Sequence, residues 1–263
     1  MIPNPAMEAF VGAIGAEKVW GQILIQPSQP GYTTRHVADR SVPAEQLKRI
    51  GLSDARKLAM FTGAGQFRPL RAAPDLPGGW LLICAGAGDL WRALQEFYPG
   101  SVADWFAVQN GVAPTNYREF TARQSGMYRI TQLLTDPQAA SVARAACHPR
   151  FCLKQRLWTV TGLEVDSSTS KSEIPCLEPC AVLLELARKA SRIEQEEKLN
   201  VQFSRSDLES FLAAAEIAVN NGLAGERTGN IGAAANPRRL QLLIEKFKDE
   251  IGPAGKSPVE SEP

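Results

Sequence analysis

The sequence lacks several features that would point directly to a function. It has only two histidines in 263 residues, His36 and His148, and no Ser/His/Asp arrangement or carboxylate pair stands out. Lys and Arg total 29 against 28 for Asp and Glu, so the charge gives no argument for a nucleic acid or membrane partner. There is no apolar run long enough to span a bilayer, and no basic segment followed by an apolar run at the N-terminus. We therefore expect a soluble, cytoplasmic protein.

Cysteine is scarce, but it is clustered. Four of the five cysteines fall within 34 residues in the pattern C-x4-C-x23-C-x3-C, namely Cys147, Cys152, Cys176 and Cys180. An odd number of cysteines in a chain without an export signal is poorly explained by disulfides. The pattern therefore predicts one metal site with these four thiolates as ligands. Its spacing matches neither the C-x2-C zinc knuckle nor the C-x2-C-x2-C run of bacterial ferredoxins, so both a 4Fe-4S cluster and a zinc ion remain open.

The residues around the cysteines favour the cluster without excluding zinc. The segment from 117 to 156 contains seven basic residues and two acidic ones, Glu119 and Asp136; the basic ones are Arg118, Arg123, Arg129, Arg144, Arg150, Lys154 and Arg156. A four-thiolate cluster is anionic and is stabilised by nearby cations, although a four-cysteine zinc site is anionic as well. For most of these arginines individually, a solvated surface position is the simpler interpretation.

Three other residues near the pattern are interpreted as structural. Cys84 ends the apolar segment WLLIC and is expected in the core, because buried free cysteines behave as small hydrophobes. His148 is expected to be a neighbour of Cys147 rather than a further ligand. Trp158 should be a core anchor that shields the site from water.

The hydrophobic patterns predict an α+β fold, with a small N-terminal antiparallel sheet and helices followed by a helix-rich, cluster-binding region. Segments 19–26 and 32–39 read as a strand pair around a Pro-Gly turn, with further strands at 80–84 and 157–165. Two short helices are expected between 44 and 62, and longer ones at 89–98, at 102–108 and from Asp136 toward Cys147. Cys176 and Cys180, four residues apart, are expected on one side of a first helical turn.

The predicted organisation has four parts. A supporting α+β region covers 1–110, the four-cysteine region covers 111–190, C-terminal helices cover 191–252, and a disordered tail covers 253–263. Three helices are expected after Cys180, the last beginning at Pro237.

Six segments resemble the iron-sulfur extension of long-form CbiX-type sirohydrochlorin cobaltochelatases: RHVADR (35–40), FRPLRAAPDLPGGW (67–80), YPGSVADW (98–105), ARQSGMYR (122–129), CLKQRLW (152–158) and PCLEPC (175–180). The resemblance covers roughly the first 190 residues. It implies a 4Fe-4S domain with Cys147, Cys152, Cys176 and Cys180 as ligands, preceded by a supporting α+β region. The chelatase domain of that family, which uses histidines, is not expected here. Leu177 also departs from the Pro or small residue expected at that position.

We predict a 4Fe-4S protein that acts as an electron-transfer or redox-sensing accessory in tetrapyrrole metabolism. The sequence favours an accessory role over an enzymatic one. Its expected partners are a redox protein or a chelatase, and an anionic tetrapyrrole that could dock on Arg123 and Arg129. The alternative is a structural zinc protein whose surface binds another protein.

Overall fold

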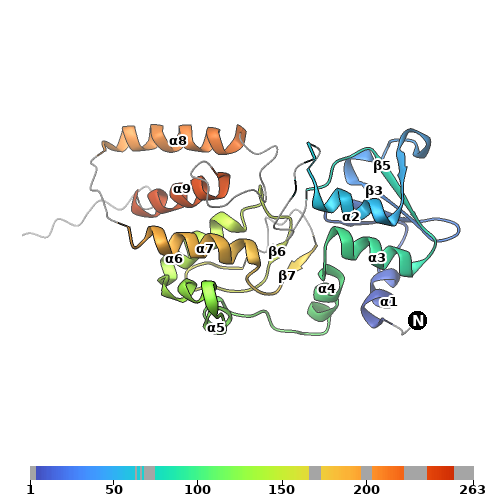
Figure 1. The fold of residues 1–263 in the computed structure, drawn as a ribbon, viewed down its shortest axis with the longest axis horizontal. Helices are drawn as coiled ribbons and strands as arrows, with labels where there is room; N and C mark the ends of the chain where they lie inside the picture. The colour runs from blue at the N-terminus through green and yellow to red at the C-terminus, as the bar shows by residue number, and fades with distance from the viewer. Residues whose placement is uncertain are drawn as a thin grey trace, which may run out of the picture.

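In the computed structural model the chain forms an N-terminal α+β part and a C-terminal helical part, joined at a two-stranded sheet (Figure 1). The structure describes residues 4–62, 64–65, 67, 75–165, 173–196, 203–221 and 236–251. The tail predicted at 253–263 lies outside these residues. No described helix is both long and apolar enough to cross a membrane.

The N-terminal part is a five-stranded sheet with the order β1-β2-β3-β5-β4. Strands β1 (Lys18–Trp20), β2 (Ile23–Pro27), β3 (Tyr32–His36) and β5 (Trp80–Cys84) pair antiparallel, while β4 (Lys48–Ile50) adds a parallel edge strand. The predicted α+β class and the mostly antiparallel sheet are confirmed. Two 3-10 turns, η1 (Val37–Asp39) and η2 (Ala44–Gln46), lie between β3 and β4.

Four details of this part differ from the prediction. The segment 19–26 forms two strands, β1 and β2, and the strand expected at 32–39 ends at His36, where η1 follows. The first of the two helices expected between 44 and 62 is wrong, because strand β4 occupies that stretch and only α2 (Leu52–Met60) is helical. A helix was also missed at the N-terminus, where α1 (Pro5–Gly12) precedes the sheet. Its signal was present in the sequence: Asn4 caps the helix by accepting a hydrogen bond from the Met7 amide, and Pro5 stands at a first-turn position.

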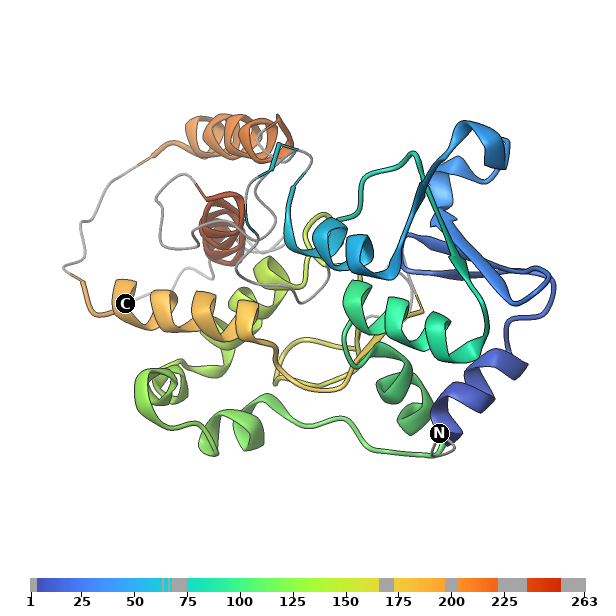
Figure 2. The same ribbon diagram turned by 45° about the vertical axis from the view of Figure 1, so that its right-hand side comes forward.

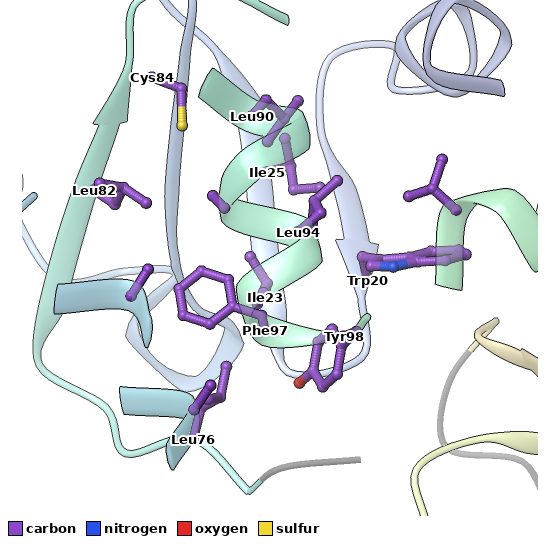
Figure 3. Packing of buried hydrophobic residues seen from close by; sticks show 14 of the residues in the cluster. Trp20, Ile23, Ile25, Leu76, Leu82, Cys84, Leu90, Leu94, Phe97 and Tyr98 are labelled. Atoms are coloured by element: carbon purple, nitrogen blue, oxygen red, sulfur yellow. The ribbon is translucent and has the colours of Figure 1, made fainter. Parts of the chain in front are cut away.

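Helix α3 (Ala87–Phe97) lies across the sheet and supplies much of the core (Figure 3). The residues Leu90, Leu94 and Phe97 recur at helical spacing and are fully buried against side chains of β2 and β5. Cys84 lies in the same core with no exposed surface, which confirms its predicted structural position. Helix α4 (Ser101–Gln109) follows, and its first residue Ser101 accepts a hydrogen bond from the buried indole of Trp20.

The C-terminal part contains α5 (Tyr117–Ala122), the 3-10 segment η3 (Gly126–Leu133), α6 (Asp136–Ala146), α7 (Ala181–Ile193), α8 (Arg205–Asn221) and α9 (Pro237–Ile251). Helix α6 and the three helices after Cys180 confirm the predicted helices. Figures 1 and 2 show α8 and α9 lying on the side of α6 and α7 away from α5. Helix α9 packs on both α6 and α8.

The strand predicted at 157–165 is wrong. Instead, the two-residue strands β6 (Gln155–Arg156) and β7 (Pro175–Cys176) pair in parallel, and the residues after β6 form turns with a single bridge between Val160 and Leu163. The small sheet is stabilised from the N-terminal side, because Leu153 and Ile174 are buried in the core of the α+β part. The N-terminal part therefore positions the segments that carry Cys152 and Cys176.

Candidate metal centre

All four predicted cysteines line one pocket, although they come from different elements. Cys147 ends helix α6, and Cys152 lies in the turn that follows it, as expected for a loop between a helix and a strand. Cys176 belongs to strand β7 and Cys180 is the residue that caps the start of α7. The expectation that Cys176 and Cys180 share a first helical turn is therefore wrong, yet their side chains still meet at the same pocket.

Local backbone bonds fix each cysteine. The Cys147 amide donates to the carbonyl of Ala143 at 2.9 Å, and the Cys152 amide donates to the carbonyl of His148 at 3.0 Å. Across the small sheet, the Leu157 amide donates to the carbonyl of Cys176 at 3.0 Å. Helix α7 begins directly after Cys180, whose side chain makes no capping bond, so the positive end of its dipole lies at the site. These features place four thiols around a common space beside a helix N-terminus.

The pKa values of three of these thiols are raised, so Cys147, Cys152 and Cys176 are hard to ionise on their own. Burial raises the pKa of Cys176 to about 12, and burial together with the neighbouring thiols raises the pKa of Cys147 well above its ordinary range. Burial likewise raises the pKa of Cys152, with a further contribution from Cys180. Thiols must lose their protons to bind metal, so ligation here releases protons, and nearby positive charge is needed to offset the crowded thiolates.

Three basic side chains line the same pocket: Lys154, Arg156 and Arg238. The Arg156 side chain is 3% exposed, lies 5.3 Å from the Trp158 ring centroid and donates to the carbonyl of Trp158 at 2.6 Å. The sequence identified Lys154 and Arg156 but gave no signal for Arg238, which is 58 residues beyond Cys180 in the chain. Three cations therefore line the pocket, which favours the binding of an anionic group.

Trp158 also contributes a buried donor to the site. Its side chain is 1% exposed, lines the pocket, and packs on Tyr117 with ring centroids 6.3 Å apart, which agrees with its predicted role as a core anchor. Its indole N–H has no hydrogen-bond partner of regular geometry, but it faces the Cys176 thiol and acts to lower the pKa of that thiol. This N–H would donate a hydrogen bond to the sulfur once the sulfur is an anionic metal ligand.

The other basic residues are divided between ion pairs and surface. Arg118 donates to Asp136 at 2.6 Å, and Arg144 pairs with Glu245 of α9 at 3.0 Å. Arg123 and Arg129 are exposed, on the end of α5 and on η3. His148 accepts a hydrogen bond from the Arg150 amide at 3.3 Å and does not line the cysteine pocket.

Comparison with known proteins agrees with this geometry. Residues 110–189 match the model of a 4Fe-4S iron-sulfur cluster binding domain. This region is therefore similar to an iron-sulfur cluster binding domain. Residues 6–109 match the DR2241 stabilising domain, so the two matched regions follow one another without a gap. The resemblance to the iron-sulfur extension of long-form CbiX-type cobaltochelatases is thereby confirmed.

Among solved structures, the chain is similar to DR2241 from Deinococcus radiodurans, described as a multi-domain protein with structural similarity to chelatases and two additional novel domains. The two are 27% identical with a TM-score of 0.60, and the match covers 73% of this chain and 41% of DR2241. The chain therefore spans less than half the length of that relative. No curated protein matches the sequence.

The residues present fit a 4Fe-4S cluster. One pocket is surrounded by four thiols, three cations, a helix N-terminus and a buried indole donor. All of these except Arg238 lie within the matched residues 110–189. Within the described part of the chain, no three Cys, His, Asp or Glu side chains are arranged to hold a single metal ion. The zinc alternative therefore gains no support.

Proposed function

We propose that Cys147, Cys152, Cys176 and Cys180 hold one 4Fe-4S cluster, and that the protein works as an electron-transfer or redox-sensing accessory in tetrapyrrole metabolism. The observation that carries the ligand assignment is that thiols from four separate elements line one pocket within the matched cluster domain. The bound cluster would supply one-electron chemistry, and the chain would supply its ligands and its electrostatic surroundings.

The accessibility of the site supports a redox role. Cys147, Cys152 and Cys180 are half-buried, so a cluster on these ligands would lie near the surface, where electrons can be exchanged with a partner. The cations around the pocket would stabilise the more negative, reduced state of the cluster and so raise its potential. No histidine or carboxylate is among the described residues that line the pocket, which favours an accessory over an enzyme.

A tetrapyrrole partner is supported by charge and by the relatives. DR2241 has structural similarity to chelatases, and sirohydrochlorin-type tetrapyrroles carry many carboxylates. The exposed Arg123 and Arg129 offer a basic surface for such a ligand, with the Arg123 guanidinium 5.7 Å from the Phe120 ring centroid.

The first experiment is anaerobic purification followed by iron and acid-labile sulfide analysis and a visible spectrum. We expect about four irons and four sulfides per chain, a strong loss in Cys176→Ser, and no loss in Cys84→Ala, whose thiol lies in the N-terminal core. One zinc without sulfide in the native chain would overturn the proposal.

The tetrapyrrole role is tested by titrating the cluster-loaded protein with sirohydrochlorin. The double variant Arg123→Gln/Arg129→Gln should weaken binding about tenfold or more, because two exposed cations are removed. The matched control is Arg49→Gln/Arg56→Gln, which removes two exposed arginines from the N-terminal part. Equal binding by the two double variants would rule out this surface.

A further inference from the structure

Helix α9 reaches the cysteine pocket, although it lies outside the matched cluster domain, which ends at residue 189. Asn236 caps the helix by accepting a hydrogen bond from the Arg238 amide at 3.0 Å. This cap and Pro237 fix the first turn, so that Arg238 enters the pocket rather than solvent. Its side chain lines the pocket beside the cysteines, and the residue is 3% exposed.

Arg238 is attached to the loop that carries two of the ligands. Its Nη2 donates to the carbonyl of Phe151 at 2.9 Å, and its guanidinium lies 5.1 Å from the centroid of the Phe151 ring. Phe151 is 2% exposed and directly precedes Cys152. One side chain of α9 thus holds the segment between Cys147 and Cys152 by a hydrogen bond and a cation-π contact.

The rest of α9 is anchored independently of this contact. Leu242 is buried in the core of the helical part, next to α6 and α7. Glu245 pairs with Arg144 of α6 at 3.0 Å, and Lys246 pairs with Glu194 at the end of α7. These contacts do not involve Phe151 or the cysteine loop, so α9 is held in place by the helical part and presents the guanidinium from a fixed position.

A buried guanidinium cannot lose its charge, so it is stabilised by negative charge nearby. Four thiolates on a cluster supply such charge. The positive charge of Arg238 lies in the same pocket as these four cysteines. The same charge would stabilise a reduced cluster, which is more negative by one electron, more than an oxidised one.

We propose that Arg238 is a positioning residue of the cluster site, which holds the 147–152 loop in place and raises the reduction potential of the cluster through its charge. This inference rests on the proposed function, because it requires the cluster. It makes α9 part of the cluster site.

The test compares Arg238→Gln, which removes the charge, with Arg238→Lys, which keeps it. The control is Arg205→Gln, which removes an exposed arginine of α8 that faces Glu209 at 3.8 Å. Each full-length protein is purified anaerobically, assayed for iron and sulfide, and titrated with dithionite and redox mediators. For Arg238→Gln we expect the reduction equilibrium to become less favourable by about tenfold, which is ~59 mV for one electron. Arg238→Lys and Arg205→Gln should remain close to the native potential.

The outcomes separate this inference from the proposed function. If the native chain holds no cluster, the proposed function fails and this inference fails with it. If the native chain is loaded and Arg238→Gln has the native potential, only the role of Arg238 is overturned. If Arg238→Gln cannot retain a cluster, the result for Arg238→Lys is the test. A cluster retained by Arg238→Lys at the native potential supports the proposal. Loss of the cluster from both variants overturns the electrostatic role.

Discussion

At the scale of single residues, the indole of Trp158 is a buried donor aimed at a ligand. Its N–H faces the Cys176 thiol and lacks another partner of regular geometry. An N–H···S bond strengthens as the sulfur becomes more negative, so it favours the reduced cluster.

Trp158→Phe should therefore lower the reduction potential while leaving iron content unchanged. The ring that packs on Tyr117 and under Arg156 is largely retained, so the expected loss is the hydrogen bond, worth roughly 1 kcal/mol. A mediator titration measures the shift. Trp105→Phe, in the N-terminal part, is the control, and equal potentials in the two variants would refute the hydrogen bond.

The Cys84 thiol gives a prediction about pH. Burial raises its pKa to about 12, above the ordinary value of 9.0. Between pH 9 and 12 the unfolded chain loses this proton and the folded chain keeps it, so the stabilising contribution is complete below pH 9 and declines as the pH rises. In that window the unfolding free energy of the native chain should fall more steeply than that of Cys84→Val, by about 1 kcal/mol per pH unit. Denaturant unfolding at several pH values measures both slopes, and parallel slopes would contradict the shifted pKa.

At the scale of elements, the two-residue strands β6 and β7 join the two parts of the molecule. Leu153 and Ile174 flank this sheet and are buried in the N-terminal core, while Cys152 and Cys176 next to them line the metal pocket. The N-terminal part thus packs directly against the neighbours of two of the four proposed ligands.

Ile174→Ala should destabilise the fold and loosen the cluster together. Removing a fully buried Ile side chain costs about 2 to 5 kcal/mol, because a cavity remains in the core. We expect a lower unfolding midpoint in denaturant and faster loss of iron to a chelator. Ile83→Ala, at a position that is 44% exposed, should have a much smaller effect on both. A destabilised variant that keeps the native rate of iron loss would show that the two parts are not coupled.

At the scale of the whole molecule, the cluster should stabilise the complete chain. The four proposed ligands come from the end of α6, the following turn, β7 and the start of α7, so one bound group would fix four segments. A ligand that binds the folded chain alone shifts the folding equilibrium toward that state.

Removing iron with a chelator under reducing conditions should lower the melting temperature by about 5 to 10 °C, if the cluster contributes roughly 3 kcal/mol. Calorimetry before and after chelation measures the shift. The Cys176→Ser variant should show no response to the chelator, and an unchanged melting temperature in the native chain would show that the cluster has no stabilising role.

The sequence by itself determined the proposed ligand set, because four cysteines within 34 residues have few other uses. It also determined the helices whose apolar residues recur at helical spacing, such as α3 and α7. It also determined the α+β class, through the alternating and apolar segments that form β2, β3 and β5.

Only the tertiary structure decided the surroundings of the site. Strand β4 forms where a helix was expected, because pairing with β5 outweighs weak local preferences. The strand predicted at 157–165 does not form. The two-residue strand β6 forms just before it, because its pairing partner β7 comes from the chain after the polar 166–173 segment. Arg238 reaches Phe151, the residue before Cys152, because α9 packs back on α6, and a contact across 87 residues leaves no local pattern in the sequence.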